Sequence, residues 1–224
     1  MKIGIIGSGV VGQTIGAKLV EAGEDVVLGT RTPGNLDDKR GMGAPLNDWL
    51  EKTSNKGRVA SFADAAAHGE IVINATAGMA SVEALRLAGE GNLDGKILID
   101  LSNALDFSHG FPPTLSVCNT DSVAEQIQRA FPAAKVVKTL NTTTAAVMVD
   151  PAKVAGGDHD LFVSGNDAAA KARVTELLRR WFGWRTVIDL GDITTARGPE
   201  MLLAIWVRLY GALGTGMFNF KVVR

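Results

Sequence analysis

Short apolar runs alternate with longer segments of helical periodicity along most of the chain. Strands are expected at 2–6, 25–28, 59–60, 71–74, 97–100 and 136–139. Helical spacing of apolar residues falls at 12–22, 46–51, 62–67, 81–87 and 121–130. Strands that are apolar throughout and separated by helices are typical of a parallel sheet covered on both faces. We therefore predict an α/β fold with a Rossmann-type doubly wound, mostly parallel sheet of about six strands.

The pattern changes near residue 155, after a loop rich in Gly and Asp. Further strands are expected at 161–163 and 186–188, with helices at 168–181 and about 199–213. We predict a Rossmann domain over 1–155 and a small α-rich C-terminal domain over 156–224, packed on the sheet as a cap. The last helix is apolar around most of its circumference. Burial within the monomer and a homodimer both account for this.

Composition limits the partners and the compartment. The 23 Lys and Arg residues nearly balance the 24 Asp and Glu residues, so no general attraction for nucleic acid or an anionic membrane is expected. The single cysteine, Cys118, cannot form an internal disulfide, which fits a reducing cytoplasm. Glycines and Lys18 interrupt the first apolar run, which argues against a signal peptide. We expect a soluble, cytoplasmic protein.

The first expected strand runs into a glycine-rich turn that opens a helix. The turn consists of Gly7, Ser8, Gly9, Val10, Val11 and Gly12, which is the pattern GxGxxG. In this context the first glycine permits the tight turn, the second lets backbone approach a pyrophosphate, and the third lets helix pack on strand. The unpaired N–H groups of the helix terminus then favour phosphate. The sequence predicts a dinucleotide site here.

The second expected strand ends without the acidic residue that would hold a ribose 2′-hydroxyl. Its tip reads VVLGTRTP over 26–33, with Glu24 and Asp25 at the opposite end of the strand. Thr30 and Thr32 offer hydroxyl groups, and Arg31 offers a planar charged group suited to a phosphate monoester. These residues favour NADP(H) over NAD(H).

The sequence lacks the residue patterns of several other kinds of enzyme. Tyr210 has no lysine four residues later, and Gly-Ser-Gly is not the Gly-x-Ser-x-Gly of hydrolases. The three histidines, His68, His109 and His159, fall in expected loops or helix ends and are interpreted as surface residues. No spacing of His or carboxylates indicates a metal site. We assign neither a catalytic side chain nor a metal ligand.

Seven segments together resemble a known family. They are MKIGIIGSGVVGQTIGAKL, VVLGTRTP, EIVINATAG, KILIDLSNAL, VVKTLNTTTA, LFVSGNDAAAK and LGTGMFNFK. Their order is similar to that in NADP oxidoreductases dependent on the deazaflavin coenzyme F420, in bacterial dinucleotide-binding relatives, and in the reductase domain of mammalian six-transmembrane metalloreductases. The segments 34–57 and 109–120 look more like the bacterial relatives, so the second substrate stays open between F420, a flavin and similar acceptors.

The resemblance implies roles for loops after successive strands. Residues 7–12 would hold the pyrophosphate, and Thr30, Arg31 and Thr32 the 2′-phosphate. Ala75, Thr76 and Ala77 would pass beside the adenosine ribose and pyrophosphate. Ser102, Asn103, Asn141, Thr142 and Thr143, with Thr144, would approach the nicotinamide. Residues 214–218 would lie near the second substrate, or form a helix end packed on the sheet.

The leading hypothesis is hydride transfer between NADPH and a second redox cofactor, which needs two flat rings stacked at near-attack distance. A second hypothesis is NADPH-dependent reduction of a small carbonyl or imine, for which Asn141, Asp106 and Tyr210 are weak proton-donor candidates. A third is a non-catalytic NADP(H) sensor.

Overall fold

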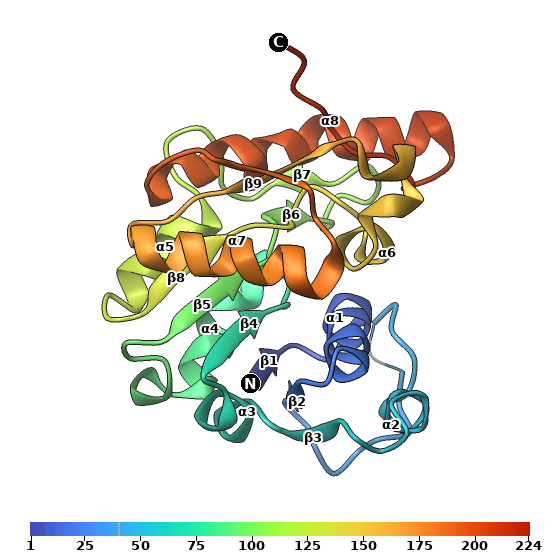
Figure 1. Cartoon of the computed structure of the whole chain (residues 1–224), viewed down its shortest axis with the longest axis vertical. Helices are drawn as coiled ribbons and strands as arrows, with labels where there is room; N and C mark the ends of the chain where they lie inside the picture. Colours follow the sequence, from blue (N-terminus) through green and yellow to red (C-terminus); the bar gives the residue numbers. More distant parts are fainter. Residues whose placement is uncertain (40) are drawn as a thin grey trace.

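The computed structural model describes residues 1–39 and 41–224, and a six-stranded parallel sheet forms its centre (Figure 1). The strands are β1 (Lys2–Ile6), β2 (Asp25–Thr30), β3 (Arg58–Ser61), β4 (Ile71–Asn74), β5 (Ile97–Asp100) and β8 (Lys135–Lys138). Their order across the sheet is β3-β2-β1-β4-β5-β8, and every neighbouring pair is parallel. This is the order of a dinucleotide-binding sheet, so the predicted doubly wound fold is confirmed.

The expected helices form close to their expected bounds. They are α1 (Val10–Glu21), α2 (Leu46–Lys52), α3 (Phe62–His68), α4 (Gly78–Ala88), α5 (Val123–Ala130), α7 (Ala168–Phe182) and α8 (Arg197–Leu213). The pattern did not predict the short helix α6 (Ala145–Met148) or the hairpin of β6 (Leu105–Asp106) and β7 (Thr114–Leu115). Both are too short to show a period in the sequence. No helix within 1–39 and 41–224 is long and apolar enough to cross a membrane.

The two faces of the sheet are buried in separate hydrophobic clusters. Ile3 and Ile5 of β1 belong to the cluster that includes residues of α1 and α7, whereas Ile6 belongs to the cluster with α3, α4 and α5. Successive strand side chains point to opposite faces, so a sheet covered on both sides needs apolar residues at every position. This explains why the strands are continuous apolar runs.

The C-terminal part shares the core of the sheet. Strands β9 (Asp160–Val163) and β10 (Thr186–Asp189) form a separate parallel pair, joined to β8 by the Lys138–Ser164 bridge. Val174 and Leu177 of α7 lie in the same buried cluster as Ile3. Helix α8 lies on the same side of the molecule as the β6–β7 hairpin (Figure 1). The division near residue 155 stays a prediction.

One histidine departs from the expected surface position. His109 is exposed, but His159 is buried and its ring meets Trp184 edge-on at 5.2 Å. Its Nε2 lies 2.9 Å from the Pro151 carbonyl oxygen, and Asn219 Nδ2 donates to its Nδ1 at 2.7 Å. The surface prediction for His159 is therefore wrong, because the C-terminal segment folds back over it and satisfies its ring.

Candidate functional site

The glycine turn lies where the strand order of the sheet reverses. Strand β1 ends at Ile6, helix α1 begins at Val10, and β1 pairs with β2 on one side and β4 on the other. Doubly wound sheets bind ligands at the carboxyl ends of the strands at this reversal. The predicted phosphate-binding turn therefore occupies the expected place.

Close backbone approach explains the glycines of this turn. Gly7 has φ +115°, and a Cβ there would lie 2.7 Å from the Ala75 carbonyl oxygen. A Cβ at Gly12 would lie 1.9 Å from the Gly7 carbonyl oxygen. Helix α1 has no side-chain cap and no acidic residue in its first turn. Its first N–H groups are thus free to bind phosphate, and these residues fit a dinucleotide pyrophosphate.

The tip of β2 presents an exposed cation, Arg31. Thr30 is buried and its Oγ1 accepts from the Thr32 amide at 3.5 Å, while Arg31 is exposed. Arg31 makes no hydrogen bond or ion pair with any residue in 1–39 or 41–224. At the other end of β2, Asp25 pairs with Arg58 at 2.7 Å, which lowers the pKa of that carboxyl group. The only carboxylate of this strand is therefore at the end away from Arg31.

Gln13 ties the segment after Arg31 to the glycine turn. Its Nε2 donates to the Ser8 carbonyl at 2.9 Å and to the Ala44 carbonyl at 2.8 Å. Trp49 of α2 donates from Nε1 to the Gln13 carbonyl at 2.9 Å. Sequence reasoning missed Gln13, whose only signal is a polar residue directly after the third glycine. These bonds connect Ala44 and α2 to the glycine turn and the start of α1.

The loops expected near the nicotinamide meet through their amides. The Gly78 amide donates to the Asn103 carbonyl at 3.1 Å, which joins the loop after β4 to the loop after β5. Asn103 Nδ2 donates to the Asn141 carbonyl at 2.9 Å, and Asn141 Nδ2 returns a bond to Asn103 Oδ1 at 3.0 Å. The structure thus brings together three of the predicted segments. Thr142 and Thr143 are buried beside Asn141, and Thr76, Ala75 and Ala77 lie in the first loop.

Sequence reasoning also missed a set of buried charged side chains under these loops. Lys138, Asp100 and Glu200 are almost wholly inaccessible, and the Lys138 ammonium contacts both carboxylates. The available signals were a lysine that ends the apolar run of β8 and an aspartate that ends the apolar run of β5. Buried charges are retained when they are paired.

The C-terminal segment packs against the loop that contains Asn141. A Cβ at Gly216 would lie 2.4 Å from Thr144 Cγ2 and 3.5 Å from the ring of Trp206. Trp206 stacks on Tyr210 at 5.7 Å and packs on Phe218 at 5.2 Å. The Thr144 hydroxyl and the Trp206 Nε1 are buried and have no hydrogen-bond partner among the described residues. Residues 214–218 therefore lie beside the expected nicotinamide loop.

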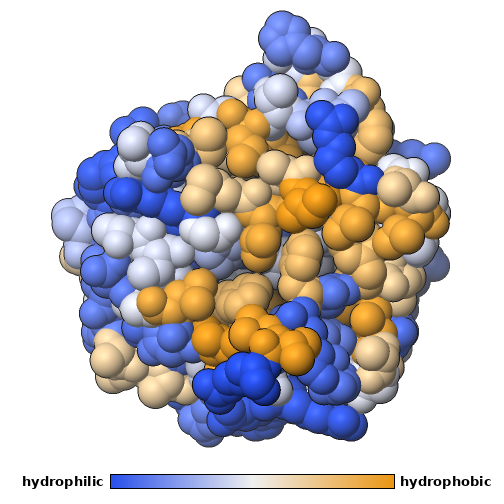
Figure 2. Space-filling view, turned by 90° about the horizontal axis from the view of Figure 1, so that it is seen from above, coloured by the Kyte–Doolittle hydropathy of each residue, from blue (hydrophilic) through white to orange (hydrophobic). Residues whose placement is uncertain are grey.

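An apolar surface surrounds this aromatic group. Phe107 and Phe111 of the hairpin and Ile205, Tyr210 and Leu213 of α8 are large hydrophobic residues with substantial exposure. Phe111 and Tyr210 meet at 6.4 Å between ring centroids. Figure 2, which views the molecule from above, shows hydrophobic side chains gathered over much of this side. Contiguous exposed apolar surface marks sites of ligand or partner binding.

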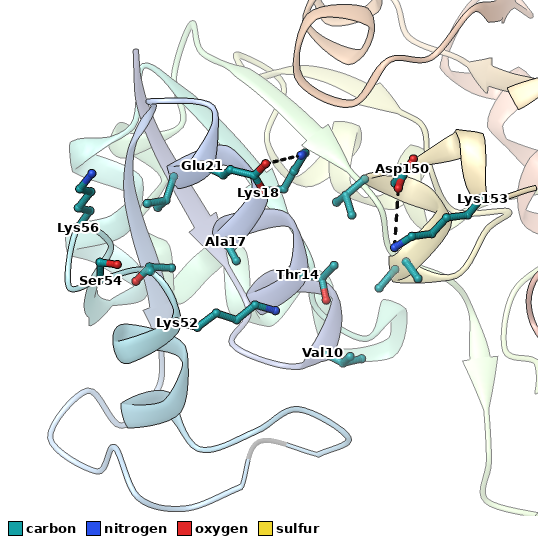
Figure 3. A pocket seen from close by; sticks show the side chains of 15 residues that line it. Val10, Thr14, Ala17, Lys18, Glu21, Lys52, Ser54, Lys56, Asp150 and Lys153 are labelled. Atoms are coloured by element: carbon teal, nitrogen blue, oxygen red, sulfur yellow. Dashed lines mark hydrogen bonds and ion pairs between the residues drawn. The ribbon is translucent and has the colours of Figure 1, made fainter. Parts of the chain in front are cut away.

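A separate hollow of about 740 Å³ lies along the outer face of α1 (Figure 3). Its lining includes Lys18, Lys52, Lys56 and Lys153, of which Lys18 pairs with Glu21 at 2.9 Å and Lys153 with Asp150 at 3.8 Å. It shares Val10 with the glycine turn but includes none of the loops after β2, β4 and β5. Ala145 and Ala146 of α6 also line it, so it borders the predicted nicotinamide loop without including the other predicted loops. No cluster of potential metal ligands occurs in the described part of the chain.

Comparison with known proteins places this geometry in context. The family described as "NADP oxidoreductase coenzyme F420-dependent" matches residues 2–104. A crystal structure from Arthrobacter sp. FB24, provisionally assigned as an F420-dependent NADP-reductase, is 57% identical, covers 100% of both chains and has a TM-score of 0.95. Metalloreductase STEAP3 of Rattus norvegicus is 29% identical over 222 residues, which are 97% of this chain and 40% of STEAP3. The chain thus spans about two fifths of the curated relatives it matches.

A more distant group shares the fold. An imine reductase from Myxococcus stipitatus in complex with NADP+ is 16% identical and has a TM-score of 0.62. The alignment covers 95% of this chain and 64% of that protein. At this identity the similarity concerns the fold alone.

Proposed function

The chain belongs to the NADP oxidoreductase, coenzyme F420-dependent, family, and on this premise we propose that it transfers hydride between NADPH and a second redox-active molecule. One observation carries the proposal: Arg31 is exposed and has no partner among residues 1–39 and 41–224, in a chain whose helix α1 begins without a side-chain cap. A guanidinium group binds a phosphate monoester with paired hydrogen bonds. Because no acidic residue stands at the end of β2, the 2′-hydroxyl of NADH would lack an acceptor there.

Each loop has a defined task in this proposal. The N–H groups at the start of α1 bind the pyrophosphate, and Arg31 with Thr30 and Thr32 holds the 2′-phosphate. Ala75, Thr76 and Ala77 pass beside the ribose. Ser102, Asn103 and residues 141–143 orient the nicotinamide through a frame of mutual amide bonds. NADPH, when bound, supplies the hydride.

The second substrate is proposed to be a flat ring system, a deazaflavin of the F420 type or a flavin. The aromatic group of Trp206, Tyr210 and Phe218 lies beside Thr144, on the side of the expected nicotinamide. Stacking of two flat rings aligns the donor and acceptor carbons and excludes water.

The test is an anaerobic reaction of the protein with NADPH and the oxidised deazaflavin, followed by the visible absorbance of the acceptor. We expect loss of absorbance well above a protein-free control. Flavin mononucleotide and a ferric chelate form the second and third arms, because they distinguish a deazaflavin acceptor from other electron acceptors. Tight NADPH binding without turnover of any acceptor would contradict an oxidoreductase and favour a sensor.

A further inference from the structure

Three charged side chains are buried beneath the loops that follow β5 and β8. Lys138 and Asp100 have no exposed side-chain surface, and Glu200 of α8 is 2% exposed. The Lys138 ammonium lies 2.8 Å from Asp100 Oδ2 and 2.9 Å from Glu200 Oε1. It also donates to the Ser102 carbonyl. We call these three residues the buried triad.

The contacts show which groups of the buried triad are charged. Asp100 Oδ1 accepts from Asn74 Nδ2 at 2.7 Å and from the Ser102 hydroxyl at 2.8 Å. The Glu200 carboxylate accepts from the amides of Val123 at 2.8 Å and Ala124 at 3.1 Å. All of these partners, and the Lys138 ammonium, donate to the carboxyl oxygens, so both groups act only as acceptors, as carboxylates do.

The ammonium is held charged as well. Burial would lower the pKa of Lys138, but the charges of Asp100 and Glu200 outweigh it and the pKa is raised. The buried triad therefore contains two negative charges and one positive charge. The start of α5 adds only partial positive charge at Glu200, and the nearby Glu125 is neutralised by Arg197 at 2.6 Å.

The place of the triad matters as much as its charge. Arg31 marks the β2 side of the crevice as the adenosine half, so the loops after β5 and β8 lie on the nicotinamide half. Asp100 accepts from the Ser102 amide at 3.2 Å, and Lys138 binds the Ser102 carbonyl. The loop expected to face the nicotinamide thus rests directly on the triad.

We propose that the net negative charge of the buried triad favours the oxidised, positively charged nicotinamide of NADP+ over the neutral ring of NADPH. Loss of a hydride leaves one positive charge on the ring, and a buried charge acts strongly across a low-dielectric site. The triad thereby sets the relative affinity of the crevice for the two forms of the cofactor and assists hydride donation. This inference rests on the proposed NADP(H) function.

The test compares the dissociation constants of NADP+ and NADPH in the intact protein and in variants, by calorimetric titration. Glu200→Gln removes one negative charge at nearly constant volume, and we expect the ratio of the NADP+ to the NADPH constant to rise three- to tenfold. Asp100→Asn should also raise this ratio, and it replaces Glu200→Gln in the test if that variant does not fold. Lys138→Gln should lower the ratio. A purely structural role would weaken both forms alike.

Asp94→Asn is the matched control. It removes an exposed negative charge just before β5, at the amino-terminal ends of the strands, whereas the buried triad lies at their carboxyl ends. Its ratio should stay unchanged. If Glu200→Gln and Asp100→Asn fold and their ratio of dissociation constants stays unchanged, or differs no more than that of the control, the inference is overturned. The proposed function would be unaffected by that result. Failure of the unsubstituted protein to bind either form would instead refute the proposed function.

Discussion

Alanine in place of Gly12 would add a methyl group where the structure has no room for one. The new Cβ would lie 1.9 Å from the Gly7 carbonyl oxygen, 3.0 Å from its carbon and 3.4 Å from Leu28 Cδ1. The first two neighbours are backbone atoms, so α1 and the glycine turn must separate by roughly 1.5 Å before van der Waals contact is restored. Overpacking of this kind costs about 1–3 kcal/mol.

The same displacement misaligns the N–H groups proposed to bind the pyrophosphate. Each hydrogen bond to a charged group contributes about 1.5–3 kcal/mol, so the loss of one weakens NADPH binding about tenfold or more. For a protein of this size the stability cost corresponds to a drop in melting temperature of about 2–12 °C. Both quantities are measured on one sample, by calorimetric titration with NADPH and by thermal unfolding.

Gly198→Ala is the matched control for this substitution. Gly198 lies in α8, where an added Cβ meets no atom within 4 Å. Alanine is favoured over glycine in helices, so this variant should be as stable as the parent or more so, with unchanged NADPH affinity. If Gly12→Ala binds NADPH and melts like the parent protein, the account of the turn is wrong.

Three further predictions concern the β2 tip, its support and an ion pair. Arg31→Ala should weaken NADPH binding by about 1–3 kcal/mol. It should barely affect NADH binding or the melting temperature, because Arg31 has no partner in the described part of the chain. Equal loss of affinity for both cofactors in titrations would show that Arg31 supports the loop instead. Gln13→Leu removes the bonds to both the Ser8 and the Ala44 carbonyls. Because Ala44 belongs to the segment that follows the β2 tip, the variant should weaken NADPH binding more than NADH binding; equal weakening would refute the tether. Arg129 lowers the pKa of Asp121 to about 2, so this pair adds stability above pH of about 4 that is lost as pH falls toward 2. The difference in melting temperature between the parent and Asp121→Asn should therefore shrink over that range, and a constant difference would contradict the assignment.

The doubly wound, mostly parallel sheet could be predicted because most of its strands are apolar on both faces. The alternation of such runs with helices leaves few topologies, and the glycine turn marks the first crossover. The expected bounds of α7 (Ala168–Phe182) and β4 (Ile71–Asn74) agree with the structure to within a residue. The hairpin of β6 and β7 could not be predicted, since two-residue strands carry no period.

In the candidate site too, features that depend on neighbouring residues could be predicted from the sequence, whereas contacts between distant residues could not. The position of the glycine turn and the lack of an acidic residue at the β2 tip could be predicted from sequence because each depends only on residues that are neighbours in the chain; their contacts with a cofactor stay a prediction. The contact of Lys138 with Glu200 joins residues 62 positions apart, and the bonds of Glu200 to Val123 and Ala124 span 77 and 76 positions. The residues around Lys138 in the sequence do not predict which carboxylates pair with it. His159 shows the same limit, because the segment that buries it lies 60 residues away.

The central claim is that the crevice passes hydride directly from NADPH to a second ring. The most direct measurement uses NADPH deuterated at the transferring position of C4 and the oxidised deazaflavin, under anaerobic conditions, with mass spectrometry of the reduced acceptor. Deuterium bound to carbon does not exchange with water, so it reports the origin of the transferred atom. We predict one deuterium in the reduced acceptor and a slower reaction than with unlabelled NADPH. Reduced acceptor that carries only hydrogen from solvent, or no reduction at all, would contradict the account.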